Sequence, residues 1–558
     1  MTPNPIAIRS SHRLKGMWLP ILVAFSVGLS IVSPIAPVEA RTRVEQNSIF
    51  SIAKPIPSIC APNCVVTYIV TRTDDPTPVG CLLGNCSLRE AIQAASAGSA
   101  AYTYNIVLVS GAVYGLNPGT LSVSNSVNIY LAGDPSTPQA NAVIQSGFSN
   151  TIMFVLNGAM VNMSNVTIEG GSTTGYGGGI YVSSGGALAL INGVVTNNIA
   201  AYSGGGIFNA GSLILLSTVV SNNQAGVSCG GVDSAQTTSI TILNSSFRNN
   251  TAQVNGGGLC IAALAVSLSN VLLSENQAST GNGGGMEYYS SGSISIDHLD
   301  AYMNLAGGYG GGIANENSDM TLSDSNIGGN TARSFGGGIA SIASNTSLQM
   351  FNSAVYNNSA WTDGGGVVTA YSALLTMTNV TVAHNLAGGN GGGIDSTNAW
   401  LFNVTIDGNQ ADADNNGSGD GGGLYIPGFN TVHMANSAVG ANTDAGSLPS
   451  DCAGSGALDS LDYNLLQSST CYLYGATAHN ILNKDPRLDQ LKHIGSATFT
   501  QDILPGSPLL NGGNPTGCIG PDGAVLSVDQ RGFKRPVGSR CDIGAIEHQV
   551  RTFIPFSQ

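Results

Sequence analysis

Short apolar runs with an alternating pattern recur through the middle of the chain, separated by Gly, Asn and Ser. In residues 256–278, for example, a glycine triplet leads into Leu259-Cys260-Ile261, and two more alternating runs follow before Asn276. A period of two residues predicts β-strands, and no run carries a helical period. One such unit therefore predicts three short strands joined by tight turns.

A glycine triplet and a later asparagine return together about every 27 residues, so the strands belong to a repeat. The triplets begin at Gly177, Gly204, Gly256, Gly283, Gly310, Gly336, Gly364, Gly391 and Gly421, and Cys229 begins a tenth copy. The asparagines are Asn198, Asn223, Asn250, Asn276, Asn304, Asn330, Asn358, Asn385, Asn409 and Asn442. Glycine suits corners where backbones approach closely, and stacked asparagines can form a buried amide ladder. We therefore predict an all-β, right-handed parallel β-helix over residues 101–446.

Nine of the ten asparagines follow a larger hydrophobic residue by three positions, as in Phe247-Arg248-Asn249-Asn250. Together with the Gly-Gly-Gly-Ile runs, this pattern resembles the repeats of polymorphic outer-membrane proteins and the wider pectate-lyase-like β-helix superfamily. The resemblance implies a solenoid fold and no particular activity.

The segments on either side of the repeats carry motifs of their own. In residues 41–100, Ser87 and Glu90 form a capping box that predicts a short helix covering the open end of the first coil. The stretch Cys86–Ala91 resembles the CSLREA motif of bacterial exported proteins. Residues 447–548, which close on Cys541–Glu547, resemble the choice-of-anchor Q domain of bacterial surface proteins and are followed by a tail, 549–558.

The first 40 residues are typical of a secretory signal peptide. A basic start is followed by an apolar run, Met17–Val32, and Val38-Glu39-Ala40 fits a cleavage site. The alternative is an uncleaved anchor, although the apolar run is short for a membrane span. We predict an extracellular or cell-surface protein with no membrane span after signal removal, and we expect a monomer.

Ten cysteines in an exported chain favour disulfides. The expected pairs are Cys81–Cys86, Cys452–Cys471 and Cys518–Cys541. Cys229 and Cys260 lie one coil apart but four positions out of register, so a disulfide through a corner and two free thiols both remain open. The pairing of Cys60 and Cys64 is also open.

The balance of charge restricts the partners. The net charge is −14, and between residues 177 and 445 only Arg248 and Arg333 are basic, against fifteen acidic residues. Such a surface excludes charge-driven binding of nucleic acid. A polysaccharide or another cell-surface ligand remains as the expected class of partner.

The motifs of polysaccharide-cleaving β-helices are incomplete here. Ile296-Asp297-His298 lacks the preceding Trp of the pectate lyases, and Arg535–Arg540 has the wrong spacing for their base motif. Hydrolysis needs paired carboxylates, and elimination needs a strong base. We therefore predict no catalytic residues; the alternative is a polysaccharide lyase or glycoside hydrolase.

Calcium is the one cofactor that a motif suggests. Residues 412–420 follow the D-x-D-x-N-G pattern of a calcium loop, whose oxygen ligands would come from Asp412, Asp414, Asn416, Ser418 and Asp420. Gly423 stands where a bidentate glutamate is expected, so the affinity should be modest. A solvated polar loop is the alternative.

Aromatic residues just before three consecutive triplets are the candidates for ligand binding. Equivalent positions of a repeat share a face, so Tyr309, Phe335 and Trp361 would form an exposed ridge on which sugar rings stack. Alternatively, the rings stack on one another and cover the glycine corners. The predicted function is a structural and binding role, adhesin-like, with a glycan as the ligand class.

Overall fold

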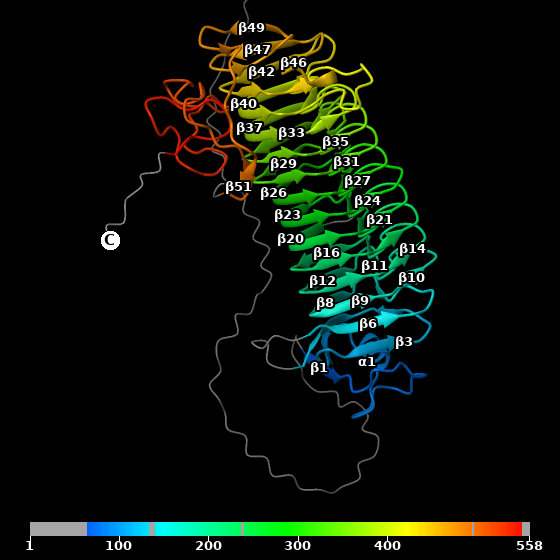
Figure 1. The fold of residues 1–558 in the computed structure, drawn as a ribbon. Coiled ribbons are helices and arrows are strands. Elements are labelled where there is room, and N and C mark those ends of the chain that lie inside the picture. Colours follow the sequence, from blue (N-terminus) through cyan, green and yellow to red (C-terminus); the bar gives the residue numbers. More distant parts are fainter. Residues whose placement is uncertain (1–63, 133–139, 236–238, 494–495, 550–558) are drawn as a thin grey trace, which may run out of the picture. The chain divides into compact units, whose positions relative to one another are not determined.

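Alternating apolar residues build a parallel solenoid of about 13 coils with about 27 residues each (Figure 1). The computed structural model describes residues 64–132, 140–235, 239–493 and 496–549. The predicted signal peptide (1–40), Cys60 and most of the predicted tail lie outside the described residues. The predicted fold class, an all-β parallel β-helix, is confirmed.

Most strands of the described residues fall into three sheets. The first sheet has 26 strands and receives one or two strands from each coil. They are β1 (Cys64–Ile69), β2 (Tyr102–Leu108), β3 (Val113–Leu116), β5 (Ser126–Leu131), β6 (Ala142–Ser146), β8 (Met160–Ser164), β9 (Val166–Glu169), β12 (Ala187–Ile191), β13 (Val194–Thr196), β16 (Ser212–Leu216), β17 (Val219–Ser221), β20 (Ser239–Arg248), β23 (Val266–Ser274), β26 (Ile294–Tyr302), β29 (Met320–Ser323), β30 (Asn326–Gly328), β33 (Ser347–Phe351), β34 (Ala354–Tyr356), β37 (Leu374–Ala383), β40 (Asn398–Asp407), β42 (Thr431–Ala435), β43 (Ala438–Gly440), β47 (Ala457–Leu461), β48 (Leu465–Leu466), β49 (Tyr472–Ala476) and β50 (Ile481–Leu482).

The second sheet has 13 strands. They are β4 (Leu121–Val123), β7 (Met153–Val155), β11 (Ile180–Val182), β15 (Ile207–Asn209), β19 (Val232–Ser234), β22 (Leu259–Ile261), β25 (Met286–Tyr288), β28 (Ile313–Asn315), β32 (Ile339–Ser341), β36 (Val367–Thr369), β39 (Ile394–Ser396), β41 (Leu424–Tyr425) and β46 (Cys452–Ala453). All but β4, β7 and β46 follow a copy of the glycine triplet.

The third sheet has nine two-residue strands. They are β10 (Ser172–Thr173), β14 (Ile199–Ala200), β18 (Gln224–Ala225), β21 (Thr251–Ala252), β24 (Gln277–Ala278), β27 (Leu305–Ala306), β31 (Thr331–Ala332), β35 (Ser359–Ala360) and β38 (Leu386–Ala387). All but β10 follow a ladder asparagine. Two antiparallel pairs complete the strands: β44 (Thr443–Asp444) with β45 (Leu448–Pro449), and β51 (Lys492–His493) with β52 (Phe499–Thr500). A single 3-10 turn spans Ala445–Ser447.

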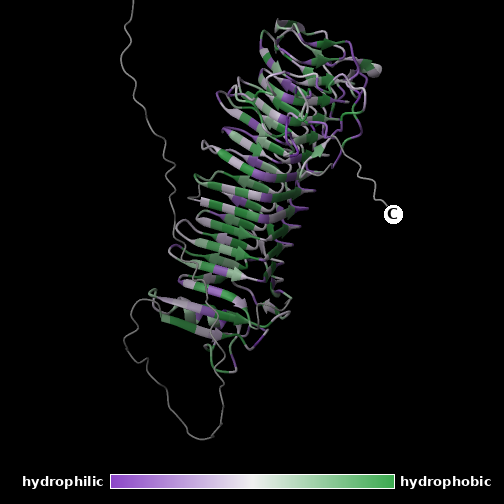
Figure 2. Cartoon of the chain, turned by 90° about the vertical axis from the view of Figure 1, so that its left-hand side faces the viewer, coloured by the Kyte–Doolittle hydropathy of each residue, from purple (hydrophilic) through white to green (hydrophobic). Residues whose placement is uncertain are grey.

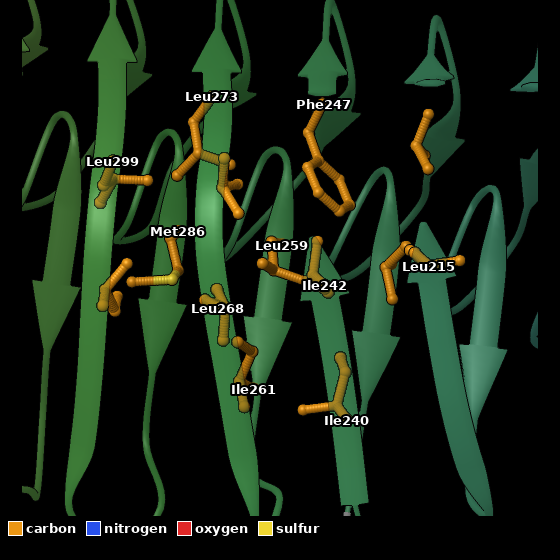
Figure 3. Packing of buried hydrophobic residues seen from close by; sticks show 14 of the residues in the cluster. Leu215, Ile240, Ile242, Phe247, Leu259, Ile261, Leu268, Leu273, Met286 and Leu299 are labelled. Atoms are coloured by element: carbon orange, nitrogen blue, oxygen red, sulfur yellow. The ribbon is translucent and has the colours of Figure 1, made fainter. Parts of the chain in front are cut away.

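The core consists of apolar columns that run from coil to coil. Ile242, Leu268 and Ile296 are in register on β20, β23 and β26, and their side chains are buried. Figure 3 shows Ile242 and Leu268 beside Leu259 and Ile261 of β22 in the interior. Figure 2 shows hydrophobic and hydrophilic residues mingled along the coils, as expected when alternate residues point inward. Burying each such side chain contributes about 1.5–3 kcal/mol.

The predicted asparagine ladder is confirmed. Asn330 is fully buried, and its Nδ2 donates to the Ala301 carbonyl and to Asn358 Oδ1, at 2.9 and 3.0 Å. Its Oδ1 accepts from the backbone N–H of Asn304 at 3.0 Å. The same pattern runs from Asn198 to Asn442, so each turn finds its hydrogen bonds in the neighbouring coils.

The glycine triplet and the asparagine ladder pack against each other at the same corner of the coil. Gly310 adopts φ +67°, which an L side chain disfavours. A Cβ on Gly311 would lie 2.3 Å from the Gly337 carbonyl oxygen of the next coil, and one on Gly312 would contact the Asn330 amide. The second and third glycines are therefore required for the coils to stack at this corner, whereas the first position needs a positive φ, which Cys229 also adopts in its copy.

The N-terminal end is closed by the predicted helix. Helix α1 (Leu88–Ser96) carries the Ser87–Glu90 capping box and buries Leu88, Ala91 and Ile92 in the main core. The coil already begins before residue 101, because β1 pairs in parallel with β2. The helix therefore covers the coil end while its flanking strand extends the sheet.

At the other end, the coil continues past residue 446, where the sequence places its boundary. Strand β47 pairs in parallel with β42, and β49 with β47. The chain leaves the coil only after β50. The remainder folds back along the first sheet, beside β37 and β40 in Figure 1.

Two buried side chains fasten this returning segment. Gln530 Nε2 donates to the carbonyls of Ser353 and Phe499, and its Oε1 accepts from the Thr381 hydroxyl. Arg535 donates to Asn379 Oδ1 at 3.0 Å. Gln530 and Arg535 thus hold the C-terminal segment against the coils.

The three predicted disulfides, Cys81–Cys86, Cys452–Cys471 and Cys518–Cys541, are all present. Cys229 and Cys260 also form a disulfide, which answers the question that the sequence left open. The corner that contains Cys229 folds over Cys260, the middle residue of β22 in the next coil. The two cysteines therefore meet although they are out of register along the chain. Cys64 is disulfide-bonded as well. In the described part of the chain, no helix has the length and apolar character needed to cross a membrane.

Candidate functional site

A groove of about 500 Å³ opens on the third sheet and brings together two regions that the sequence singled out. It is lined by Ser359, Ala360, Trp361, Leu386, Gly388, Ala413 and Asp414. Trp361 belongs to the predicted glycan-binding ridge and Asp414 to the predicted calcium loop. Neither prediction placed them side by side.

The groove exists because of the residues at one repeat position. Trp361, Gly388 and Ala413 lie in three consecutive coils, and each donates its backbone N–H to an alanine carbonyl of the coil before it. A Cβ on Gly388 would lie 2.3 Å from the Trp361 carbonyl oxygen, so this position has no side chain. Together with the small Ala413, it leaves the space beside the indole open.

Trp361 forms one wall of the groove and is 62% exposed. In the preceding coil, Arg333 holds the equivalent position, and its guanidinium carbon lies 5.5 Å from the centre of the indole ring. This contact orients the indole without filling the groove, because Arg333 does not line it. Leu386, which is 40% exposed, adds an apolar surface.

The other two predicted ridge residues lie elsewhere, so the ridge of three equivalent rings is not formed. Tyr309 and Phe335 stand one residue before their triplets and stack with ring centres 5.0 Å apart. The equivalent residue in the next coil is Asp363, whereas Trp361 lies two positions earlier. Tyr309 and Phe335 are half-buried, and of the three rings only Trp361 is largely exposed.

The predicted calcium ligands lie on one loop but face different partners. Asp412 is buried, and its carboxylate accepts from the backbone N–H groups of Asn416 and Gly417, both at 2.9 Å. Asp414 accepts from the Asn416 amide at 2.8 Å, and Asp420 accepts from Gly421 N–H. Ser418 is exposed. Among the described residues, no three acidic, His or Cys side chains gather as a metal-binding group.

A pair of carboxyl groups escaped the sequence analysis. Glu287 is 4% exposed in the middle of β25, and it hydrogen-bonds with Glu316 from the turn after β28. Burial, together with the nearby Glu316 carboxylate, raises the pKa of Glu287 to about 9. Glu316 Oε1 also accepts from the Tyr309 hydroxyl at 2.7 Å and from Asn282 at 3.0 Å. With this raised pKa, Glu287 keeps its proton at neutral pH.

Glu287 lies in a column of outward-facing positions that the triplet corners cover. Asp233 lies two coils earlier in this column, and burial raises its pKa to about 7. Asp395 lies four coils later than Glu287, and burial, with Asp363 nearby, raises its pKa to about 8. Acidic residues on the outward face of a strand predict a solvated surface, and no local signal shows that a corner covers them.

The residues that echo polysaccharide-cleaving enzymes do not converge. Asp297 and His298 lie on the exposed surface, with Nδ1 of the imidazole 2.8 Å from Oδ2 of the carboxylate. Arg535 is fully buried and fastens the C-terminal segment.

Comparisons with known proteins add little. No family model matches the chain, and no curated protein matches it. Among solved structures, the crystal structure of pectate lyase Pel9A is similar, with a TM-score of 0.30 and 13% identity over 87% of this chain and 96% of that one. A likeness at this level supports no conclusion about activity. The fold class rests on the strand pairing described above.

Proposed function

We propose that the protein is an exported binding protein of the cell surface or extracellular space, and that the Trp361 groove holds a glycan. The observation that carries this proposal is the exposed indole face beside an open groove. Sugar rings stack on aromatic faces through their apolar C–H surface. Two coil spacings, about 10 Å, separate the levels of Trp361 and Ala413, which accommodates one ring between the walls.

The disulfides support the extracellular assignment, because they indicate an oxidising environment. Four disulfides link described cysteines, a number typical of proteins outside the reducing cytosol. The N-terminal segment typical of a signal peptide and the CSLREA and choice-of-anchor Q resemblances agree with export to the bacterial surface. The solenoid then serves as a rigid scaffold that displays the groove.

The test is a glycan-array screen of the mature chain, followed by titration of each bound glycan. Trp361→Ala should weaken binding about tenfold or more, which corresponds to about 1.4 kcal/mol of lost stacking. The matched control is Tyr472→Ala, which removes a 71% exposed aromatic residue from β49, outside the groove. Equal binding by Trp361→Ala and wild type would refute the proposal.

The Glu287–Glu316 pair favours a second candidate function, a glycan-cleaving enzyme. A carboxyl group with a raised pKa beside a second carboxyl group is an element of general acid–base chemistry. Against this, the two groups are in hydrogen-bond contact, whereas glycoside hydrolases keep their carboxyl groups about 5 Å or more apart. Release of reducing ends or unsaturated products from a bound glycan, lost in Glu316→Gln, would establish the enzyme.

A further inference from the structure

The two walls of the groove differ in chemistry. On one side lies the face of the Trp361 indole, and on the other lies the exposed carboxylate of Asp414. No lining residue is basic. The surrounding repeats carry fifteen acidic residues and two basic ones, so the field around the groove is negative.

This combination matches a cation. The face of an indole attracts positive charge through its quadrupole, and a carboxylate forms a charge-assisted hydrogen bond with an ammonium group. Resting on the proposed glycan-binding function, we propose that the groove selects glycans that carry a free, protonated amine, as in glucosamine residues. The sugar ring stacks on Trp361, and its ammonium group faces Asp414.

The same walls disfavour the other classes of glycan. The carboxylate of a uronic acid would face Asp414 within a negative field, and Arg333, the cation that packs on the indole, does not line the groove and so does not offset this repulsion. An N-acetylated amine carries no charge, so it retains the stacking and loses the interaction with the carboxylate. The predicted order of affinity is free amine, then N-acetylated amine, then uronic acid.

The experiment compares three oligosaccharides of matched length by isothermal titration calorimetry: oligomers of glucosamine, of N-acetylglucosamine and of galacturonic acid. Measurements are made at about pH 6, where such amines are protonated and carboxylates are ionised. A chelator is present because Asp414 also belongs to the predicted calcium loop. Wild type should bind the glucosamine oligomer about tenfold more tightly than the N-acetylated one, and added salt should narrow the difference.

Two substitutions of equal charge change locate the effect. Asp414→Asn should remove the preference for the free amine and leave binding of the N-acetylated oligomer unchanged. Asp297→Asn, an exposed aspartate outside the groove, should keep the wild-type preference. Trp361→Ala should weaken binding of both oligomers.

The outcomes separate the two proposals. Equal affinity of wild type for both amino-sugar oligomers, an unchanged preference in Asp414→Asn, or tighter binding of the galacturonic acid oligomer would overturn the amine selectivity while leaving glycan binding in place. If no oligosaccharide in this set or on the array binds, or if Trp361→Ala binds like wild type, the glycan-binding function itself fails.

Discussion

Glu287 should make the stability of the folded protein depend on pH. Its carboxyl group is buried, and burial together with the Glu316 carboxylate raises its pKa to about 9. An unfolded glutamate, with a pKa of about 4.5, releases its proton where the folded protein still holds it. We therefore expect the free energy of unfolding to fall as the pH rises between these two values.

The magnitude follows from proton linkage. The contribution is fully present below about pH 4.5 and is lost as the pH rises toward about 9, at about 1.4 kcal/mol per pH unit. Between about pH 6 and about pH 8, this group alone should lower the free energy of unfolding by about 3 kcal/mol. Asp233 and Asp395, whose pKa values are also raised, act in the same direction.

Glu287→Gln isolates this contribution. Glutamine keeps the side-chain size and donates to Glu316 at every pH, so the pH dependence should become shallower by the amount given above. The assay is urea denaturation at a series of pH values, and the difference between the two proteins includes the electrostatic interaction of Glu287 with Asp233. The control is Glu275→Gln, an exposed glutamate. If Glu287→Gln keeps the wild-type pH dependence, the raised pKa of Glu287 is refuted.

Three further predictions concern the ladder, the loop and the C-terminal segment. Asn330→Ala removes two donated hydrogen bonds and leaves the Asn304 N–H unpaired, so it should lower the free energy of unfolding by about 1–3 kcal/mol in urea denaturation. The control, Asn317→Ala at an exposed position, should change it little, and an unchanged midpoint for Asn330→Ala would contradict an internal ladder. Millimolar calcium should raise the melting temperature of the mature protein, and Asp412→Ala with Asp414→Ala should abolish the shift, whereas calcium-independent melting of wild type would leave only the polar loop. Gln530→Ala should increase amide hydrogen exchange in residues 496–549 well before it affects β12, because the buried amide bridges to Ser353 and Thr381; uniform exchange would refute this fastening role.

The repeat was predictable because its signals are local and occur in every coil. A few consecutive residues are enough to recognise each of these signals: the triplets, the asparagines and the Ser87–Glu90 capping box. The capping helix and three disulfides followed from the same kind of reasoning.

The features that the sequence could not show are those that depend on the register between coils and on contacts between segments far apart in the chain. Trp361 was grouped with Tyr309 and Phe335 because all precede a triplet, yet an offset of two residues changes its surroundings completely. Glu287 meets Glu316 only because one coil stacks on the next and a corner covers the strand. The docking of Gln530 joins residues far apart in the chain, and no periodic signal reports it.

The returning C-terminal segment changes how the molecule would bear load. A simple solenoid has contacts only between neighbouring coils, so a pull at one end can peel it one turn at a time. Here, hydrogen bonds from residues 497–545 reach five consecutive coils, at Asn326, Ser353, Asn379, Asn403 and Asn436. Tension applied at the C-terminus is therefore distributed over these five coils at the same time. That end of the protein should therefore resist peeling until the whole segment detaches.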